Sequence, residues 1–247
     1  MNIANITGYK FTPIEDTSNL QKDISNCSNK LKLKGTVLIS NKGLNFSIAG
    51  TRDNVDTFIE FLYTYERFKN MPIKTTYNDY QPFRKMLVRI KKEIISMGVD
   101  DIDPFVFTGA KISPLELNEK LNNNEDVVLL DTRNEYEVRL GTFENAIDLN
   151  LDSFRDFPNE MEYLKKTLEG KDIVMFCTGG VRCEKASALM LKNGFQNVRQ
   201  IDGGIINYFK ETGGNHWKGD CFVFDDRVAL DKDCLLYTSD AADDLLC

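Results

Sequence analysis

The sequence predicts an α/β protein built from two consecutive parts, and two patterns lead to this prediction. The first hundred residues show strand and helix patterns in the order β-α-β-β-α-β. From residue 112 onward, short apolar strands alternate with helices, which indicates a largely parallel sheet. Hydrophobic residues make up 42% and charged residues 28% of the 247 residues, a composition that is ordinary for a globular domain.

Alternating apolar patterns define the elements of the first part. Strands are expected at Ile3–Phe11, Gly35–Ser40, Leu44–Ala49, Ile73–Tyr77 and Lys85–Lys91, and helices at Asp16–Leu31 and Thr51–Phe68. The turn signal Asn41-Lys42-Gly43 joins two of these strands into a hairpin. This order is typical of a ferredoxin-like α+β domain, which we expect to cover residues 1–95.

Positive charge is concentrated in this first part. Residues 1–100 of the chain carry 15 Lys and Arg against 10 Asp and Glu, although the whole chain has a net charge of −7. The last expected strand has an apolar face and a mostly basic face. The basic residues in and beside it are Arg84, Lys85, Arg89, Lys91 and Lys92. Such a stripe either binds phosphates or protects the edge of a sheet, and the sequence leaves both roles open.

The second part begins after an expected linker at residues 96–111. Strands are expected at Val127–Leu130, Ala146–Leu149, Ile173–Phe176 and Val198–Ile201, and helices at Asp156–Leu168, at Glu184–Asn193 and up to Phe209, with a further helix opening at Ser113. We expect this domain to cover residues 112–214 and a C-terminal extension to cover residues 215–233. Residues 234–243 match the translation of a sequencing adapter, so we expect residues 234–247 to be a non-native tail, with a genuine short tail as the alternative.

A reactive cysteine is expected where the apolar strand Ile173–Phe176 ends. Cys177 follows directly, and the chain continues Thr178-Gly179-Gly180-Val181-Arg182-Cys183 before the next expected helix. The two glycines let the loop curl so that successive N–H groups point inward, and the helix N-terminus adds positive potential. Together with the charge of Arg182, this setting favours a thiolate and indicates an activated nucleophile. A buried cysteine beside a phosphate-binding loop is the alternative.

Three motifs in residues 112–210 resemble those of the rhodanese superfamily. The loop at Cys177 resembles its Cys-x-x-Gly-x-Arg motif, and Asp202-Gly203-Gly204 resembles its closing glycine turn. Upstream, Asp131, Arg133, Glu137 and Gly141 stand at the spacing of its Asp-x-Arg-x-x-x-Glu-x-x-x-Gly signature. The resemblance implies a rhodanese-like α/β domain in which Cys177 is catalytic. It also implies that Thr178, Gly179, Gly180, Val181, Arg182 and Cys183 form the active-site cradle, supported by Asp131, Arg133 and Glu137.

Further segments are similar to one branch of that superfamily, the oxygen-dependent tRNA uridine 5-hydroxylases. These segments are Lys34–Leu38, Gln81–Phe83, Lys91–Ile94, Phe176–Lys185 and Cys221–Arg227. The similarity spans residues 3 to about 230. It implies that tRNA is the partner, that its wobble uridine becomes 5-hydroxyuridine, and that molecular oxygen is the co-substrate. The basic strand would then bind the tRNA. Residues 41–46 depart from the family pattern, which affects substrate choice if this hairpin contacts RNA.

Two roles are open for Cys183. It either resolves an oxidised or persulfidated Cys177, or it is a small packing residue that seats the following helix. Arg133 and Glu137 are expected to form an ion pair beneath the cradle.

Trp217 lies in a polar, glycine-flanked stretch, where it either stacks on a base or anchors the C-terminal segment. Anchoring is expected. Cys221 and Cys27 are expected to be packing residues.

Several classes of site are not supported by the sequence. The six cysteines contain no CxxC pair and His216 is the only histidine, so a zinc site of Cys and His is not expected. No flavin, haem or iron motif is visible, and we expect no bound cofactor or metal. No segment has the roughly 20 apolar residues that span a membrane, and no secretory signal is visible. The expected location is therefore the cytoplasm.

Three functions are compatible with these patterns. The first is a tRNA-modifying oxygenase, in which the basic domain binds RNA and Cys177 acts on uridine. The second is a sulfurtransferase that carries a persulfide on Cys177, although simple sulfur transfer does not require a basic companion domain. The third is a non-catalytic module whose cradle binds an anion.

Overall fold

The computed structural model describes residues 3–230 and divides them into two compact units. The first unit contains the residues up to Ile95 together with Phe224–Arg227. The second unit contains Ser96–Val223 and continues from Val228. The expected non-native tail at 234–247 lies outside the described residues. Within residues 3–230, no helix is long and apolar enough to cross a membrane.

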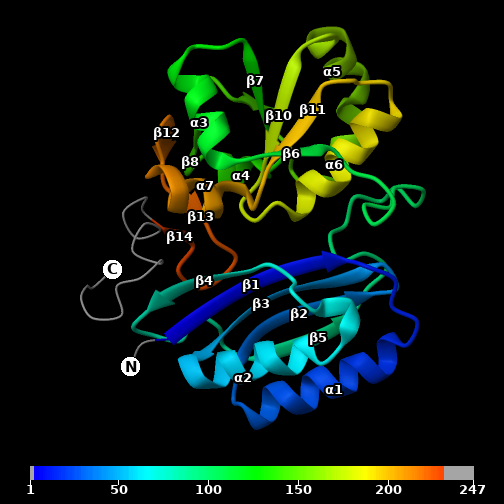
Figure 1. The fold of residues 1–247 in the computed structure, drawn as a ribbon, viewed down its shortest axis with the longest axis vertical. Coiled ribbons are helices and arrows are strands. Elements are labelled where there is room, and N and C mark those ends of the chain that lie inside the picture. Colours follow the sequence, from blue (N-terminus) through cyan, green and yellow to red (C-terminus); the bar gives the residue numbers. More distant parts are fainter. Residues whose placement is uncertain (1–2, 231–247) are drawn as a thin grey trace. The chain divides into compact units, whose positions relative to one another are not determined.

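A five-stranded sheet forms the first unit (Figure 1). Its elements are β1 (Ile3–Phe11), α1 (Thr17–Lys30), β2 (Lys34–Ser40), β3 (Gly43–Thr51), α2 (Arg52–Tyr63), the 3-10 helix η1 (Glu66–Phe68), β4 (Ile73–Asn78) and β5 (Met86–Ile90). The strand order is β4-β1-β3-β2-β5, and only β5 runs parallel to its neighbour. This confirms the ferredoxin-like order, with β5 as an additional strand at the edge.

Alternating side chains of this sheet pack under the two helices, which Figure 1 shows on one face. Ile6 and Phe46 from the sheet join Ile24 of α1 and Phe58 of α2 in one buried core. Asp16 caps α1, because its Oδ1 accepts the backbone N–H of residue 19 at 2.9 Å. At the edge strand β5, Arg89 and the basic side chains that flank the strand are exposed.

A short C-terminal segment completes the first unit. Arg227 forms two hydrogen bonds with Asp225, at 2.7 and 2.5 Å, and its third nitrogen donates to Oγ1 of Thr76 on β4 at 3.1 Å. The backbone N–H of Asp226 donates to the carbonyl of Pro82 at 3.0 Å. The side chains of Arg227 and Asp225 are only 8% and 6% exposed. The described part of the expected C-terminal extension, residues 215–230, is therefore shared between the two units.

A parallel sheet organises the second unit. Its strands are β6 (Ala110–Ile112), β7 (Val127–Asp131), β9 (Ile147–Asp148), β10 (Asp172–Phe176) and β11 (Val198–Ile201), in the order β6-β11-β10-β7-β9. Its helices are α3 (Pro114–Asn122), α4 (Glu135–Val138), the 3-10 helix η2 (Phe154–Glu160), α5 (Met161–Leu168), α6 (Val181–Lys192) and α7 (Gly204–Thr212). Short strands complete it: β8 (Gly141–Phe143), β12 (Trp217–Gly219), β13 (Cys221–Phe222) and β14 (Ala229–Leu230). Figure 1 shows α3 and α7 on one side of the sheet and α5 and α6 on the other, so the predicted α/β domain is confirmed.

Several boundaries differ from the sequence-based prediction. The helix expected at 51–68 is α2 followed by the separate 3-10 helix η1. β6 begins inside the expected linker, ends at the first residue of the expected domain and pairs with β11. A strand of three residues is too short to give an alternating pattern. The expected helix at 156–168 is two elements, because Pro158 lies in a 3-10 segment before α5. The helix expected from Glu184 already begins at Val181, since Gly180 adopts a left-handed φ of 98° and turns the chain directly into α6.

Trp217 anchors the C-terminal segment, as expected. It is 8% exposed, and its ring centroid lies 5.1 Å from that of Phe143 and 5.2 Å from that of Phe209. In this buried position its ring is not offered to a base. Cys221 is fully buried and Cys27 packs against the first core, so both packing predictions are confirmed.

Arg227→Ala should destabilise the first unit, because it leaves the buried Asp225 carboxylate without its cation. We expect a loss of about 3 kcal/mol in the free energy of unfolding. Hydrogen exchange of the β4 backbone amides, followed at increasing urea concentrations, measures this free energy of unfolding. Lys69→Ala is the control, because Lys69 pairs with Glu66 in an exposed contact at 3.7 Å whose loss should cost under about 0.5 kcal/mol. Equal effects of the two variants would contradict the assigned role of Arg227.

Candidate active site

The loop after β10 encloses the sulfur of Cys177. The backbone N–H of Gly180 donates to this sulfur at 3.1 Å, which the left-handed conformation of Gly180 permits. Gly204 closes the loop from below, where the N–H of Ile205 donates to the carbonyl of Cys177 at 3.0 Å. A Cβ on Gly204 would lie 2.5 Å from that same carbonyl oxygen and 2.8 Å from the nitrogen of Gly180. Only glycine fits there, which gives the predicted closing turn a physical reason.

The environment of Cys177 favours its thiolate. The residue is 1% exposed, and burial raises the pKa of its thiol. Hydrogen bonding from the Cys183 side chain, the charge of Arg182, and the backbone N–H groups of Cys183 and Arg182 together outweigh burial. The pKa of Cys177 is thereby lowered to about 5. Both donors lie in the first turn of α6, so the predicted cradle consists of a loop and a helix terminus.

Cys183 is the thiol partner of this thiolate. Burial raises its pKa well above the ordinary value, and the adjacent Cys177 sulfur raises it further. Cys183 therefore stays protonated, and its S–H group donates a hydrogen bond to the Cys177 thiolate. Its sulfur also lies 3.5 Å from Oγ1 of Thr132, whose hydroxyl donates to the carbonyl of Phe176 at 3.0 Å. This direct contact is compatible with both sequence-based roles of Cys183.

Glu137 holds Arg182 beside the thiolate. The two side chains form a bidentate pair with N–O distances of 2.5 and 2.7 Å, and their side chains are 0% and 5% exposed. Glu137 also accepts the backbone N–H of Asn134 at 3.1 Å and lies 3.4 Å from the hydroxyl of Thr178. Burial lowers the pKa of Arg182, but the hydrogen bonds and charge of Glu137 outweigh it and raise the pKa. The cation next to Cys177 is therefore permanent.

The expected ion pair between Arg133 and Glu137 is wrong in its partners. Arg133 instead pairs with Asp131, with contacts of 2.7 to 3.2 Å. Its hydrogen bond to Glu137 goes to the main-chain oxygen, at 3.5 Å, and not to the carboxylate. It also donates to the carbonyl of Gly141 at 2.6 Å and lies 5.1 Å from the ring centroid of Trp217. Spacing alone could not separate two carboxylates that are six residues apart.

Other predicted site residues are placed as follows. Thr178 and Gly180 of the cradle are buried, whereas Gly179 and Val181 are half-buried. Thr132 was not predictable from the sequence, because it occupies a variable position of the Asp-x-Arg signature and therefore carries no pattern of its own. Within residues 3–230, no group of three or more His, Cys, Asp and Glu is arranged to hold a metal ion.

The predicted basic residues belong to the first unit. Arg84, Lys85, Arg89, Lys91 and Lys92 are all exposed in and beside the edge strand β5. Arg84 lies 3.6 Å from the carboxylate of Asp226, so part of its charge is balanced. Both sequence-based roles, phosphate binding and protection of a sheet edge, fit this position.

Comparison with known proteins gives the site its context. Residues 3–94 match the family model of the UPF0176 acylphosphatase-like domain, and residues 113–211 match the rhodanese-like domain. The chain is 44% identical to a tRNA uridine(34) hydroxylase of Cupriavidus pinatubonensis, over 93% of this chain and 83% of the relative. A Bordetella petrii protein with the same name is 42% identical over 93% of both chains. The chain belongs to the tRNA uridine(34) hydroxylase family.

A solved structure gives a more distant comparison. A rhodanese-related protein from Thermoplasma volcanium aligns with a TM-score of 0.33 and 24% identity, over 42% of this chain and 93% of that one. The assignment to the family rests on the sequence matches, and so does the identification of the rhodanese-like domain.

Cys177 should react with iodoacetamide over an unusually wide pH range. Only the thiolate is nucleophilic, and its pKa is lowered to about 5. The alkylation rate should therefore stay constant as the pH falls from 8 to 6 and decrease only as the pH passes through about 5. Mass spectrometry of the labelled peptides measures the rate at each pH.

Two comparisons serve as controls for this profile. Burial raises the pKa of Cys27, so the labelling of Cys27 should already decline below pH 8. Cys183→Ala removes a donor to the thiolate and should move the midpoint of Cys177 upward, whereas Cys183→Ser should move it less. A Cys177 midpoint near 8 in the unmodified protein would contradict the assigned electrostatics.

Proposed function

We propose that this protein hydroxylates the wobble uridine of tRNA at C5, with Cys177 as the catalytic thiolate and molecular oxygen as co-substrate. One observation carries the proposal: a chain similar over 93% of its length to tRNA uridine(34) hydroxylases places a lowered-pKa thiolate in an intact cradle. The name of the relatives states the substrate class and the reaction. The geometry of the loop provides the nucleophile.

The balance of the reaction defines what the site must support. Replacing C5–H by C5–OH removes two electrons from the uracil ring. When molecular oxygen supplies the oxygen atom, its second atom becomes water and takes two electrons and two protons from a donor, for which a thiol is the fitting chemical class. The Cys177 thiolate either adds to C6 of the uracil, which makes C5 electron-rich, or reacts with the oxidant at its sulfur. Both routes make Cys177 indispensable.

Arg182 and Cys183 serve the thiolate in either route. The fixed cation of Arg182 stabilises negative charge on the sulfur. Cys183 holds a proton in contact with it. A reaction without resident flavin, haem or iron is part of this proposal, and stoichiometric metal or flavin in active preparations would refute that part. A cytoplasmic location and the absence of a membrane partner are likewise proposed, in line with a tRNA substrate.

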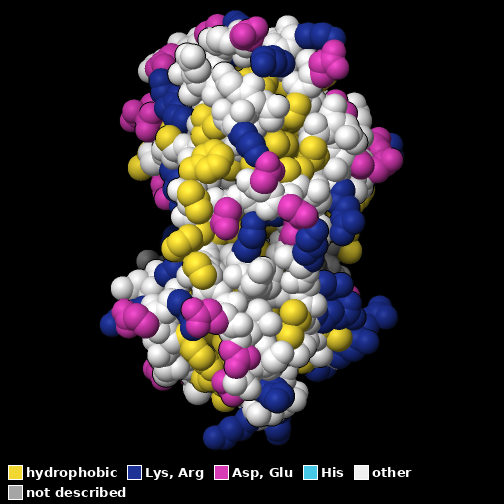
Figure 2. All heavy atoms as spheres, turned by 90° about the vertical axis from the view of Figure 1, so that its right-hand side faces the viewer, with side chains coloured by type: hydrophobic (Ala, Val, Ile, Leu, Met, Phe, Trp, Pro, Cys, Tyr) yellow, Lys and Arg dark blue, Asp and Glu magenta, His cyan; other side chains and the backbone are white. Residues whose placement is uncertain are grey.

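The exposed basic residues of β5 and its flanks fit the backbone of the tRNA. Figure 2 shows Lys and Arg side chains gathered on one side of the first unit, with few Asp and Glu side chains among them. A stripe of positive charge attracts a polyanion such as RNA, and binding releases the counterions of the RNA phosphates. Arg89, Lys91 and Lys92 are exposed at the end of the strand, where they are the strongest candidates for phosphate contacts.

A persulfide-carrying sulfurtransferase is the second candidate. The donors that stabilise the Cys177 thiolate would also stabilise the terminal sulfur of a persulfide. Transfer of that sulfur to a thiol or to cyanide would regenerate the thiolate. This activity does not explain the basic first unit.

Replacing Arg89 and Lys91 by Ser should weaken tRNA binding, because each change removes a positive charge that can face a phosphate. The slope of log Kd against log salt concentration should fall by about 0.7 to 0.9 for each phosphate that is no longer neutralised. Fluorescence anisotropy with labelled tRNA measures this slope. Lys165→Ser, an exposed change on α5, is the control and should leave it unchanged. An unaltered slope in the double variant would assign these residues to edge protection alone.

Loss of Cys177 should abolish the modification in cells. In a strain lacking this protein, 5-hydroxyuridine and its derivatives should return with the wild-type chain and not with Cys177→Ser. Nucleoside mass spectrometry of total tRNA gives the readout. A change in a thiolated nucleoside with constant 5-hydroxyuridine would instead establish the sulfurtransferase. Full rescue by Cys177→Ser would leave only the non-catalytic anion-binding module.

A further inference from the structure

An exposed tyrosine directly precedes, in the chain, the residue that clamps the active-site loop. Tyr136 lies in α4, and 48% of its surface is exposed. The following residue is Glu137, which holds Arg182 at 2.5 and 2.7 Å and contacts the hydroxyl of Thr178. The chain therefore places the ring of Tyr136 one residue away from a side chain that touches the cradle of Cys177.

The ring is held in position although half of it faces solvent. Its hydroxyl accepts a hydrogen bond from Nδ2 of Asn134 at 3.2 Å. Phe222 meets it edge-on, with ring centroids 5.2 Å apart and planes inclined at 75°. These contacts fix the ring from two sides and leave a large part of its surface uncovered. A fixed ring loses little conformational freedom when a flat ligand stacks on it.

The buried sulfur makes such a surface useful. Cys177 is 1% exposed, so a base can reach it only after leaving its stacking partners in the RNA. Proteins that read single-stranded RNA replace that stacking with aromatic side chains. Among the cradle and signature residues Asp131–Glu137 and Cys177–Cys183, Tyr136 is the only aromatic side chain, and every other member is buried or half-buried.

We propose that Tyr136, braced by Phe222, is a stacking platform for a nucleobase in the single-stranded RNA segment that carries the target uridine. This inference rests on the proposed function, because it takes RNA as the substrate. It adds a binding residue that positions the RNA and leaves the chemistry to Cys177. The interaction needs no particular base, since every base has a π face.

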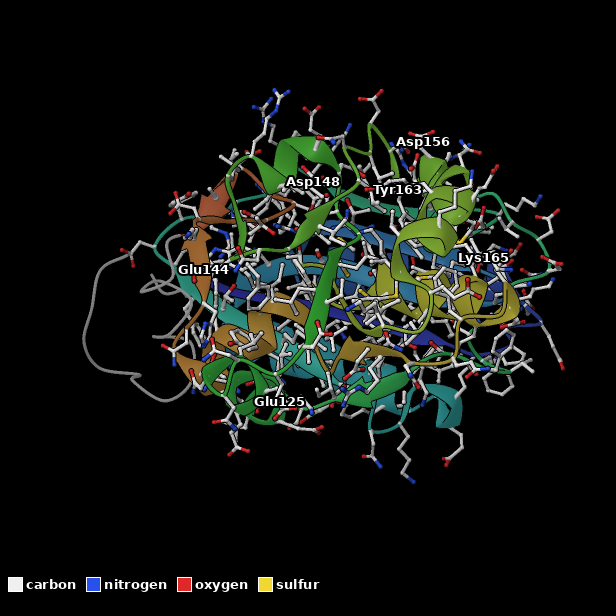
Figure 3. The ribbon with its side chains drawn as sticks, turned by 90° about the horizontal axis from the view of Figure 1, so that it is seen from above. Glu125, Glu144, Asp148, Asp156, Tyr163 and Lys165 are labelled. Carbon is white, nitrogen blue, oxygen red and sulfur yellow. The ribbon has the colours of Figure 1, made fainter. Side chains whose placement is uncertain are left out.

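Other exposed aromatic residues lack this placement. Tyr163 is 51% exposed on α5, and Figure 3 shows it on the outer side of the unit near Asp156 and Lys165. It has the same side chain and nearly the same exposure, and its helix belongs neither to the loop nor to the signature segment. Tyr163 is therefore a matched control for the loss of an exposed tyrosine.

The test compares Tyr136→Ala, Tyr136→Phe and Tyr163→Ala in the full-length protein. The probe is a fluorescently labelled RNA hairpin with the target uridine in its loop, and both Kd and the rate of 5-hydroxyuridine formation are measured. Tyr136→Ala should raise Kd and KM about 5- to 150-fold, the range expected when one base loses its aromatic stacking partner. Tyr136→Phe keeps the ring and should retain most of the binding. Tyr163→Ala should match the wild-type protein.

A second measurement identifies the base and excludes a folding defect. Abasic sites are introduced one at a time at the target position and at its neighbours. If Tyr136 stacks on one of these bases, the penalty of Tyr136→Ala should disappear for the corresponding abasic hairpin. An equal penalty with every hairpin would overturn base stacking. The pH profile of Cys177 alkylation should be unchanged in Tyr136→Ala, which shows that the cradle is intact.

The outcomes separate this inference from the proposed function. If the wild-type protein forms 5-hydroxyuridine and Tyr136→Ala behaves like Tyr163→Ala, the platform is refuted and the function stands. If the wild-type protein binds the hairpin through Tyr136 and forms no 5-hydroxyuridine, the platform stands and the proposed reaction fails. If the wild-type protein neither binds nor modifies RNA, both fail.

Discussion

The organisation of the second unit depends on placing an anionic sulfur at the N-terminus of a buried helix. Cys177 is only 1% exposed, and a thiolate buried to this extent without a partner would be strongly disfavoured. The first turn of α6 offsets this cost by directing N–H groups and the Arg182 cation at Cys177. The strand β10 has to end at Cys177, Gly180 has to turn the chain, and α6 has to begin at Val181 for these groups to converge.

Buried charges then determine the surroundings of the loop. Arg182 needs a carboxylate because it is almost fully buried, and Glu137 supplies it from the segment after β7. Arg133 is fully buried as well and takes Asp131. Two cations and two carboxylates thus form separate pairs beneath one thiolate. The pair of Glu137 and Arg182 joins two elements that are distant in the chain. The pair of Asp131 and Arg133 fixes the segment after β7. The signature residues therefore stabilise the fold around the loop.

The sequence was sufficient for the architecture and for the position of the buried thiolate. Strong apolar patterns predicted the longer strands of both sheets, and the loop motif alone singled out Cys177. Pairings within the site were not predictable, because Arg133 has carboxylates available at positions 131 and 137 and only the folded chain selects one. Elements of two or three residues, such as β6 and β13, have no periodicity to detect. The start of α6 was misplaced because a left-handed glycine can end a loop or extend it.

The docking of Phe224–Arg227 on the first unit makes that unit discontinuous in the chain. During synthesis, residues up to Ile95 leave the ribosome first, but the partner of Thr76 on β4 is not made until Arg227 has been added. The first unit can therefore collapse early and reaches its final set of hydrogen bonds only after the entire parallel sheet of the second unit has been translated. The N-terminal unit is therefore completed only after almost all residues of both units have been synthesised.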